Sequence, residues 1–166
     1  MTGPARAGRV RLTAAVLIPV LAGLDLGVKA WAESGLADGR TVDLALIQLR
    51  LAHNSGVAFS FGDTLPAAVV LAATGLIIAA LAAYTWRAAR TTPAPVAAGL
   101  ALVVAGAVAN FTDRAADGVV TDYLHTGWFP TFNGADVLIT VGVASLILGS
   151  FRAEQPDKGD SHDRIR

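Results

Sequence analysis

Four long apolar stretches, separated by polar segments, dominate the chain. They cover about residues 12–32, 64–86, 91–114 and 136–152. A helix needs roughly 20 predominantly apolar residues to cross the hydrocarbon core of a bilayer. The second stretch carries no charged residue, and the third carries none before Asp113. The pattern predicts an all-α membrane protein with four transmembrane helices.

The segment between the first two stretches, residues 33–63, has a different period. From Val42 to Leu46 every second residue is a large aliphatic one, and from Ile47 to Leu51 the large aliphatic residues alternate in the opposite phase. Alternation indicates β-strands, and a change of phase indicates a bulge or turn. We therefore expect a small β-sheet and loop on the extracytoplasmic side, with a bulge or turn near Leu46. An ordinary hydrophobic loop is the alternative.

The first apolar stretch also has features of a secretory signal peptide. It follows three arginines and ends in A-W-A at residues 30–32, an A-x-A pattern typical of a cleavage site. Asp25 and Lys29 lie where a cleavage region should be small and neutral. This argues for a retained first helix.

Composition supports the membrane prediction and excludes some kinds of catalytic site. Of the 166 residues 54% are hydrophobic and only 16% are charged, and the mean hydropathy is +0.54. A soluble domain carries about 25% charged residues. The net charge is zero, so nothing suggests nucleic-acid binding. The absence of cysteine excludes thiolate catalysis, and three histidines do not make a convincing metal site. We expect no cofactor.

Basic residues are distributed unevenly between the connecting segments. Nine lie in the N-terminus, in the turn between the second and third stretches, and in the tail; the other side has only Arg40, Arg50 and Arg114. Lys and Arg accumulate on the cytoplasmic side. We therefore expect both termini in the cytoplasm and the two long loops outside. Residues 1–152 form a single predicted membrane domain, and the polar tail 153–166 is predicted to be disordered.

The second outer region, residues 110–136, is unusually acidic, with aspartates at positions 113, 117, 122 and 136. Asp136 begins the fourth apolar stretch, so it or Asn133 could cap that helix. Arg114 ends the third stretch, where a cation complements the helix dipole. Asp122 belongs to neither helix end, although it could stand in a turn or at a strand end.

Charged side chains within membrane helices are costly and are usually paired or functional. Asp25 and Lys29 are four residues apart, so they share one helix face and can pair. Such a pair could simply neutralise itself, or it could serve the site. Asn110 and Asp113 are three residues apart and face the same way.

Two carboxylates that converge from separate segments can share a proton, because like charges in close contact cannot both ionise easily. One can then take a proton from water while the other protonates a scissile carbonyl or leaving amine. That is aspartic-type peptide hydrolysis. The acidic residues could instead form a relay in a small proton-coupled transporter, or the loops could be the binding surface of a non-catalytic assembly subunit.

Five motifs in order resemble those of the lipoprotein signal peptidase (signal peptidase II) family of membrane aspartic peptidases. They are L-D-L-G-V-K at 24–29, H-N-S-G-V-A-F at 53–59, G-A-V-A-N-F-T-D-R at 106–114, G-V-V-T-D-Y at 118–123 and F-N-G-A-D at 132–136. Each motif alone is weak, but five in this order across four expected spans are specific.

The resemblance implies a role for each matching residue. Asp122 and Asp136 would be the catalytic dyad, and Asn54 and Gly56 would line the substrate site. The remaining matches would support the dyad, contact substrate or form an accessory pair; they are Asn110, Asp113, Arg114, Asn133, Asp25 and Lys29. The implied substrate is a diacylglyceryl-modified prolipoprotein, cleaved just before its lipidated cysteine by a monomer in the bacterial cytoplasmic membrane.

Three positions depart from the usual pattern of the family. Leu26 stands where Gln is usual, Ala109 where Gly is usual, and Tyr123 where Phe is more common. None of these changes removes a titratable group of the expected site. They therefore bear on packing rather than on the expected chemistry.

Overall fold

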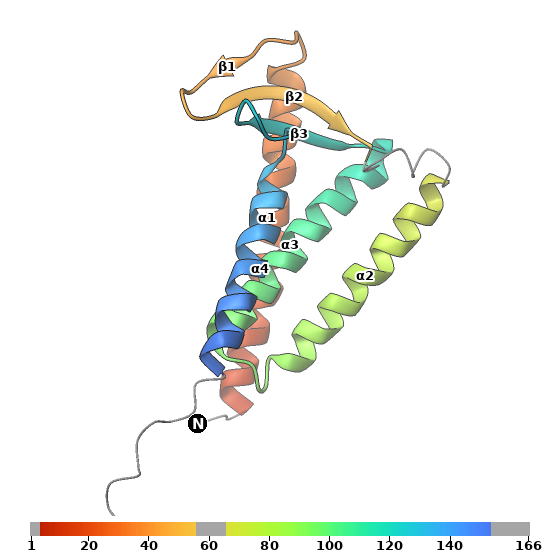
Figure 1. The fold of residues 1–166 in the computed structure, drawn as a ribbon. Coiled ribbons are helices and arrows are strands. Elements are labelled where there is room, and N and C mark those ends of the chain that lie inside the picture. The colour runs from red at the N-terminus through yellow and green to blue at the C-terminus, as the bar shows by residue number, and fades with distance from the viewer. Residues whose placement is uncertain (1–3, 56–65, 154–166) are drawn as a thin grey trace, which may run out of the picture.

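The computed structural model describes residues 4–55 and 66–153. Its elements in chain order are α1 (Pro4–Gly35), β1 (Val42–Asp43), β2 (Gln48–Asn54), α2 (Ala67–Ala88), α3 (Ala94–Asp117), β3 (Val120–His125) and α4 (Gly134–Ala153). All four helices are long and apolar enough to cross a membrane. The fold is thus mostly helical with a small sheet at one end, as the hydropathy pattern predicted (Figure 1).

Helix α3 packs against each of the other three helices, and it buries the largest share of its apolar length. Glycines allow this close packing. A Cβ on Gly99 would come within 2.9 Å of the Gly142 carbonyl oxygen on α4, and a Cβ on Gly106 would come within 2.8 Å of Ile139. Small residues let membrane helices approach closely enough for backbone contact. Helices α3 and α4 therefore form the tightest pair of the bundle.

The sheet has the strand order β1-β2-β3 and is antiparallel throughout. The predicted turn is present between β1 and β2, where Ala45 has a positive φ of 72° and the Leu44 N–H donates to the Ile47 carbonyl. This turn explains the change of phase in the sequence. Ala32 and Leu36, near the end of α1, form a buried cluster with Tyr123 of β3. Leu49 and Leu51 of β2 pack against this cluster.

Strand β3 was not predicted as part of the sheet, which we placed in the loop between the first two helices. It comes from the connection between α3 and α4, and it carries Asp122. Its first four residues are all buried, so the polar–apolar alternation that marks a half-exposed strand is missing. Gly118 ends α3 in the left-handed conformation, with φ 92°, and turns the chain directly into the strand.

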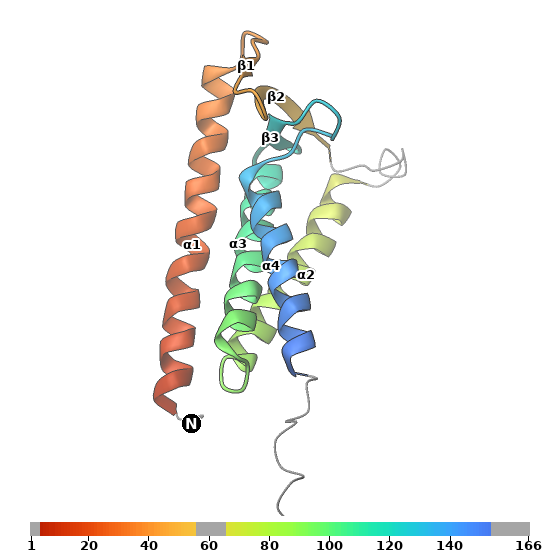
Figure 2. The same ribbon diagram turned by 60° about the vertical axis from the view of Figure 1, so that its left-hand side comes forward.

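The helix boundaries differ modestly from those expected. Helix α1 begins at Pro4 rather than near residue 12, and α4 begins at Gly134 rather than at Asp136. The sheet lies at one end of the bundle. The start of α1, the α2–α3 turn and the end of α4 lie at the other end (Figures 1 and 2). We call these the sheet end and the arginine end, the latter after Arg6, Arg9, Arg11, Arg87 and Arg90.

Candidate active site

Asp122 and Asp136 approach the same point of the sheet end from different elements. Asp122 lies in β3, whereas Asp136 is the third residue of α4. Asn133 joins them: its Nδ2 donates to Asp122 Oδ1 at 2.7 Å, and its backbone N–H donates to Asp136 Oδ2 at 3.2 Å. Asn133 is fully buried. The two carboxylates are therefore held on either side of one rigid asparagine.

The start of α4 fixes the position of Asp136. Asn133 Oδ1 accepts the Asp136 N–H at 3.0 Å while Asp136 accepts the Asn133 N–H, a reciprocal capping box. The Gly134 N–H donates to the Tyr123 hydroxyl at 3.0 Å, and the Ala135 N–H donates to Asp25 Oδ1 at 2.9 Å. Side chains thus satisfy the amides that a helix N-terminus leaves free. Asn133 is therefore the N-cap of α4, and Asp136 completes the capping box from the third position of the helix.

Lys29 forms the centre of a buried polar cluster beneath the pair. Its side chain is 2% exposed, and Nζ lies 3.2 Å from Asp25 Oδ2, 3.1 Å from Asp113 Oδ2 and 2.6 Å from Asn110 Oδ1. Asn110 Nδ2 in turn donates to Asp136 Oδ1 at 2.9 Å. The predicted Asp25–Lys29 pair is present, but it is not a self-contained neutral pair, because Lys29 also connects to α3 and through Asn110 to Asp136.

Asp113 ties this cluster to β3. Its Oδ2 accepts the backbone N–H of Thr121 at 2.7 Å, one residue before Asp122. Lys29 is therefore linked through Asp113 to Thr121, the residue before Asp122. It is also linked through Asn110 to the side chain of Asp136. A buried charge is tolerated only when it is paired and hydrogen-bonded, so this arrangement constrains both segments.

Asp122 has an unusual electrostatic environment, with only 2% of its surface exposed. Burial raises the pKa of its carboxyl above the ordinary value, because the charged form loses its hydration. Hydrogen bonds from Asn133 and Asn54 act in the opposite direction, as does the charge of Lys29, whereas the Asp136 carboxylate raises the pKa further. The balance favours the protonated form of Asp122 relative to a solvated aspartate.

A cleft of about 610 Å³ opens beside Asp136. One wall is the α4 face with Val137, Thr140 and Val141, and the other is the connection from β3 to α4. Lining residues from that connection and from β2 are Asn54, Thr126, Trp128, Phe129, Pro130, Thr131 and Phe132. The cleft is of the size that holds a ligand, and it is mostly apolar with a few polar groups. Asp136 is its only acidic lining residue among the residues that the structure describes.

Arg114 connects α3 to the end of β2. Its Nη2 donates to the Asn54 carbonyl at 3.4 Å, so it reaches the strand as well as standing in the last turn of its helix. Asn54 also contacts Asp122 and lines the cleft. Gly56, which the resemblance also placed at the substrate site, lies outside the described residues. Asp117 is exposed and accepts the Val119 N–H in the turn after α3.

Sequence reasoning missed two groups that support this site. Tyr123 was noted only as a departure from the family pattern, yet its hydroxyl accepts the Gly134 N–H and lies 3.4 Å from Asp25 Oδ1, to which it donates. Burial raises the pKa of Tyr123 to about 12. Glu33 was not considered; its Oε1 accepts Thr121 Oγ1 at 3.0 Å and lies 2.7 Å from His53 Nε2. Neither role has a sequence signal, because the partners come from distant elements.

Comparison with known proteins gives consistent results. The family described as signal peptidase (SPase) II matches residues 17–152. The lipoprotein signal peptidase of Gloeobacter violaceus is 37% identical over 142 residues, covering 79% of this chain and 77% of its own. That of Brucella ovis is 38% identical over 143 residues, covering 82% and 86%. That of Rhodococcus jostii is 34% identical over 156 residues, covering 89% and 76%.

Two solved structures, both described as bacterial membrane enzymes, share the fold. One has a TM-score of 0.76 and 23% identity, covering 90% of this chain and 93% of its own. The other has a TM-score of 0.75 and 24% identity, covering 86% and 94%. The match of the family over most of the chain, together with relatives above 30% identity, shows that this chain belongs to the signal peptidase II family.

Proposed function

We propose that this chain is a membrane aspartic endopeptidase that removes signal peptides from prolipoproteins, with Asp122 and Asp136 as its catalytic dyad. The relatives named lipoprotein signal peptidase support the substrate class. One observation carries the assignment of the dyad: Asn133 holds carboxylates from β3 and α4 on either side of a single side chain. The transporter and assembly-subunit alternatives are not favoured by the family membership.

The two aspartates have different surroundings, and we assign them different parts of the reaction. Asp122 is buried, and its raised pKa suits a carboxylic acid that holds a proton and donates it to the scissile carbonyl or the leaving amine. Asp136 lines the cleft, and each of its two carboxyl oxygens accepts an N–H donor, which fixes the orientation of the group toward the cleft. Asp136 would therefore take the proton of the attacking water.

Lys29 and Asn110 would orient the base rather than touch the substrate. Because Asn110 Oδ1 accepts from Lys29, its amide group must present Nδ2 to Asp136. This fixes one Asp136 oxygen, and the Asn133 N–H fixes the other. Asp25 and Asp113 each form an ion pair with Lys29. Arg114 keeps β2 and Asn54 beside the cleft.

The cleft suits a peptide that emerges from the bilayer beside a lipid group. Its apolar walls end at Asp136, at the sheet end of the spanning helices. The distribution of basic residues supports an orientation with the arginine end in the cytoplasm and the proposed dyad at the outer face of the membrane. At that depth water reaches the scissile bond. The family resemblance adds cleavage before a diacylglyceryl-modified cysteine by a monomer, with Asn54 and Gly56 against the substrate.

Cleavage of a synthetic diacylglyceryl-lipobox precursor by purified protein tests the proposal. Asp122→Asn and Asp136→Asn should each lower the rate by about 10²–10⁴-fold or more, the range expected for loss of a general acid or base. Asp117→Asn is the matched control, because Asp117 is exposed and, within the described part of the chain, its side chain bonds only to the turn after α3. Processing at the wild-type rate by either dyad variant would refute the role of that residue. Thermal denaturation of each variant shows whether it still folds.

A further inference from the structure

The arginine end carries a marked excess of positive charge. Arg6, Arg9 and Arg11 lie near the start of α1, Arg87 lies in the last turn of α2, and Arg90 lies in the α2–α3 turn. Within the described residues, α1 has no acidic residue before Asp25, α3 has none before Asp113, and α2 has none at all. Helix α4 has none after Asp136. Carboxylates of the described helices therefore do not neutralise these arginines.

Two of the three arginines of α1 are bound to backbone carbonyls. Arg11 Nε donates to the Trp86 carbonyl at 3.1 Å, and its guanidinium stacks 4.9 Å from the Trp86 ring. Arg6 Nη2 donates to the Thr92 carbonyl at 3.4 Å. Arg9 makes no hydrogen bond or ion pair with the residues that the structure describes. Its donors are thus available to a ligand.

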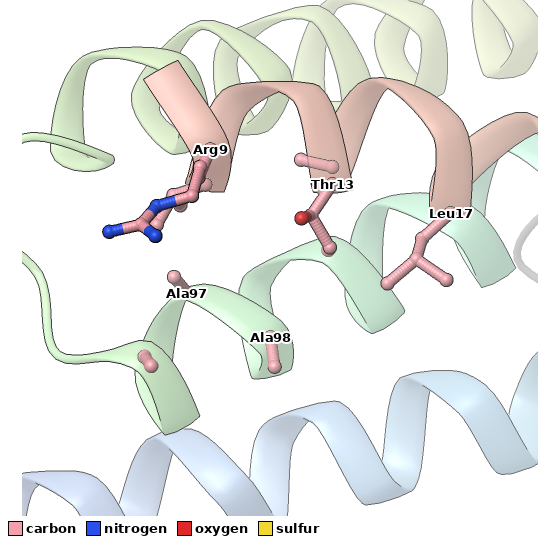
Figure 3. Close-up of a pocket in the computed structure, with 9 residues that line it drawn as sticks. Arg9, Thr13, Leu17, Ala97 and Ala98 are labelled. Atoms are coloured by element: carbon pink, nitrogen blue, oxygen red, sulfur yellow. The ribbon is translucent and has the colours of Figure 1, made fainter. Parts of the chain in front are cut away.

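Arg9 stands at the edge of an apolar groove of about 300 Å³ between α1 and α3. In Figure 3 Arg9, Thr13 and Leu17 follow one another along α1, and Ala97 and Ala98 of α3 lie opposite. The further lining residues are Val10, Ala14, Ala94 and Ala101. The groove exists because the two helices part here: between Ala7 and Ala22, no residue of α1 is buried. Alanines on α3 then leave the space unfilled.

We propose that this groove binds one anionic phospholipid, with its phosphate at the Arg9 guanidinium and an acyl chain along Leu17 and the alanines of α3. Arginine binds phosphate through several N–H donors, and basic pockets between transmembrane helices suit anionic headgroups. The groove supplies both requirements: among the described residues Arg9 has no partner at the helix ends, and the groove walls toward the bilayer centre are apolar. The binding site is remote from Asp122 and Asp136 and does not depend on the peptidase reaction.

The polar tail is the competing occupant. Residues 154–166 carry four carboxylates that could meet Arg9, but also three basic residues, and Ile165 is their only aliphatic side chain for the groove. An anionic lipid satisfies the charge and the apolar walls together. Both the lipid and the tail carry negative charge, so the experiment must distinguish which of them occupies the groove.

Native mass spectrometry of the full-length protein, delipidated in neutral detergent, tests the site. The probes are phosphatidylglycerol and phosphatidylcholine with identical acyl chains. We expect wild type to retain phosphatidylglycerol about tenfold more strongly, and Arg9→Gln to remove that preference while leaving phosphatidylcholine retention unchanged. Arg87→Gln is the matched control: it removes the same charge at the same end, from an exposed residue that does not line the groove. Ala98→Phe, which fills the groove from an exposed position, should lower retention of both lipids.

Three outcomes would overturn the proposal. Equal losses in Arg9→Gln and Arg87→Gln would mean that the lipid responds only to diffuse charge. Equal retention of the two lipids by wild type would remove the anionic requirement. Phosphatidylglycerol binding that appears only after truncation at Ala153 would make the tail the occupant. The assay needs no substrate, so loss of the proposed peptidase function would leave its result intact.

Discussion

Removal of the Tyr123 hydroxyl is the sharpest test of how the two carboxylate-bearing segments are joined. That oxygen accepts the N–H of Gly134, the first residue of α4, and donates to Asp25 on α1. Tyr123 directly follows Asp122, and Gly134 lies two residues before Asp136. One hydroxyl therefore links the strand of one aspartate to the helix of the other. Tyr123→Phe keeps the ring and its packing with Ala32 and Leu36.

The structure sets the size of the effect. Tyr123 is 6% exposed, so the lost hydroxyl would leave the Gly134 N–H without its partner in a largely buried setting. An orphaned buried donor costs about 1–3 kcal/mol. The bond to Asp25 is long, at 3.4 Å, and Asp25 keeps the Ala135 N–H and Lys29, so its loss adds little. We expect Tyr123→Phe to lower the free energy of unfolding by about 1–3 kcal/mol.

The assay is unfolding in mixed detergent micelles, combined with cleavage kinetics on the lipobox precursor. Tyr84→Phe is the matched control, because Tyr84 is the only other tyrosine and its side chain is 60% exposed on α2. If the link positions Asp136, kcat should fall about tenfold, which corresponds to about 1.4 kcal/mol, while KM stays unchanged. A Tyr123→Phe protein as stable and as active as Tyr84→Phe would refute the reasoning.

Three further perturbations test other parts of the fold. Gly106→Ala should destabilise the protein by about 1–3 kcal/mol in thermal denaturation, because the added Cβ would overlap α4. Gly27→Ala is the control: the space around Gly27 is open, so this change should be neutral or slightly stabilising. Equal effects of the two changes would contradict the packing argument. Lys29→Met should cost about 3–5 kcal/mol by leaving two carboxylates unpaired, and a markedly smaller loss when Asp25→Asn is added would confirm the pairing. The pKa of Asp122 is higher in the folded state than in the unfolded state, so protonated Asp122 favours the folded protein. This contribution to the free energy of unfolding is fully present below the unfolded-state pKa and is lost as pH rises. Asp122→Asn should therefore gain stability relative to wild type as pH rises from about 4 to 7 in denaturation curves, and a constant difference would contradict this.

The sequence alone determined the framework of the protein. A bilayer-length apolar run is a local property, so hydropathy located all four helices within a few residues, apart from the early start of α1. The turn near Leu46 was also signalled locally, because a change of alternation phase indicates a bulge or a turn. The motifs that carry Asp122 and Asp136 were readable for the same reason, and they remain the basis of the proposed dyad.

The tertiary structure decided which of these residues meet. Strand β3 escaped prediction because it is buried on both faces, which removes the alternation that marks a strand. The bridge through Asn133, the three partners of Lys29 and the link through Tyr123 join elements that are remote in the chain. Such hydrogen bonds depend on how closely the helices approach. The glycines of α3 allow α3 and α4 to pack closely, and the local pattern of polar and apolar residues does not show which side chains then meet.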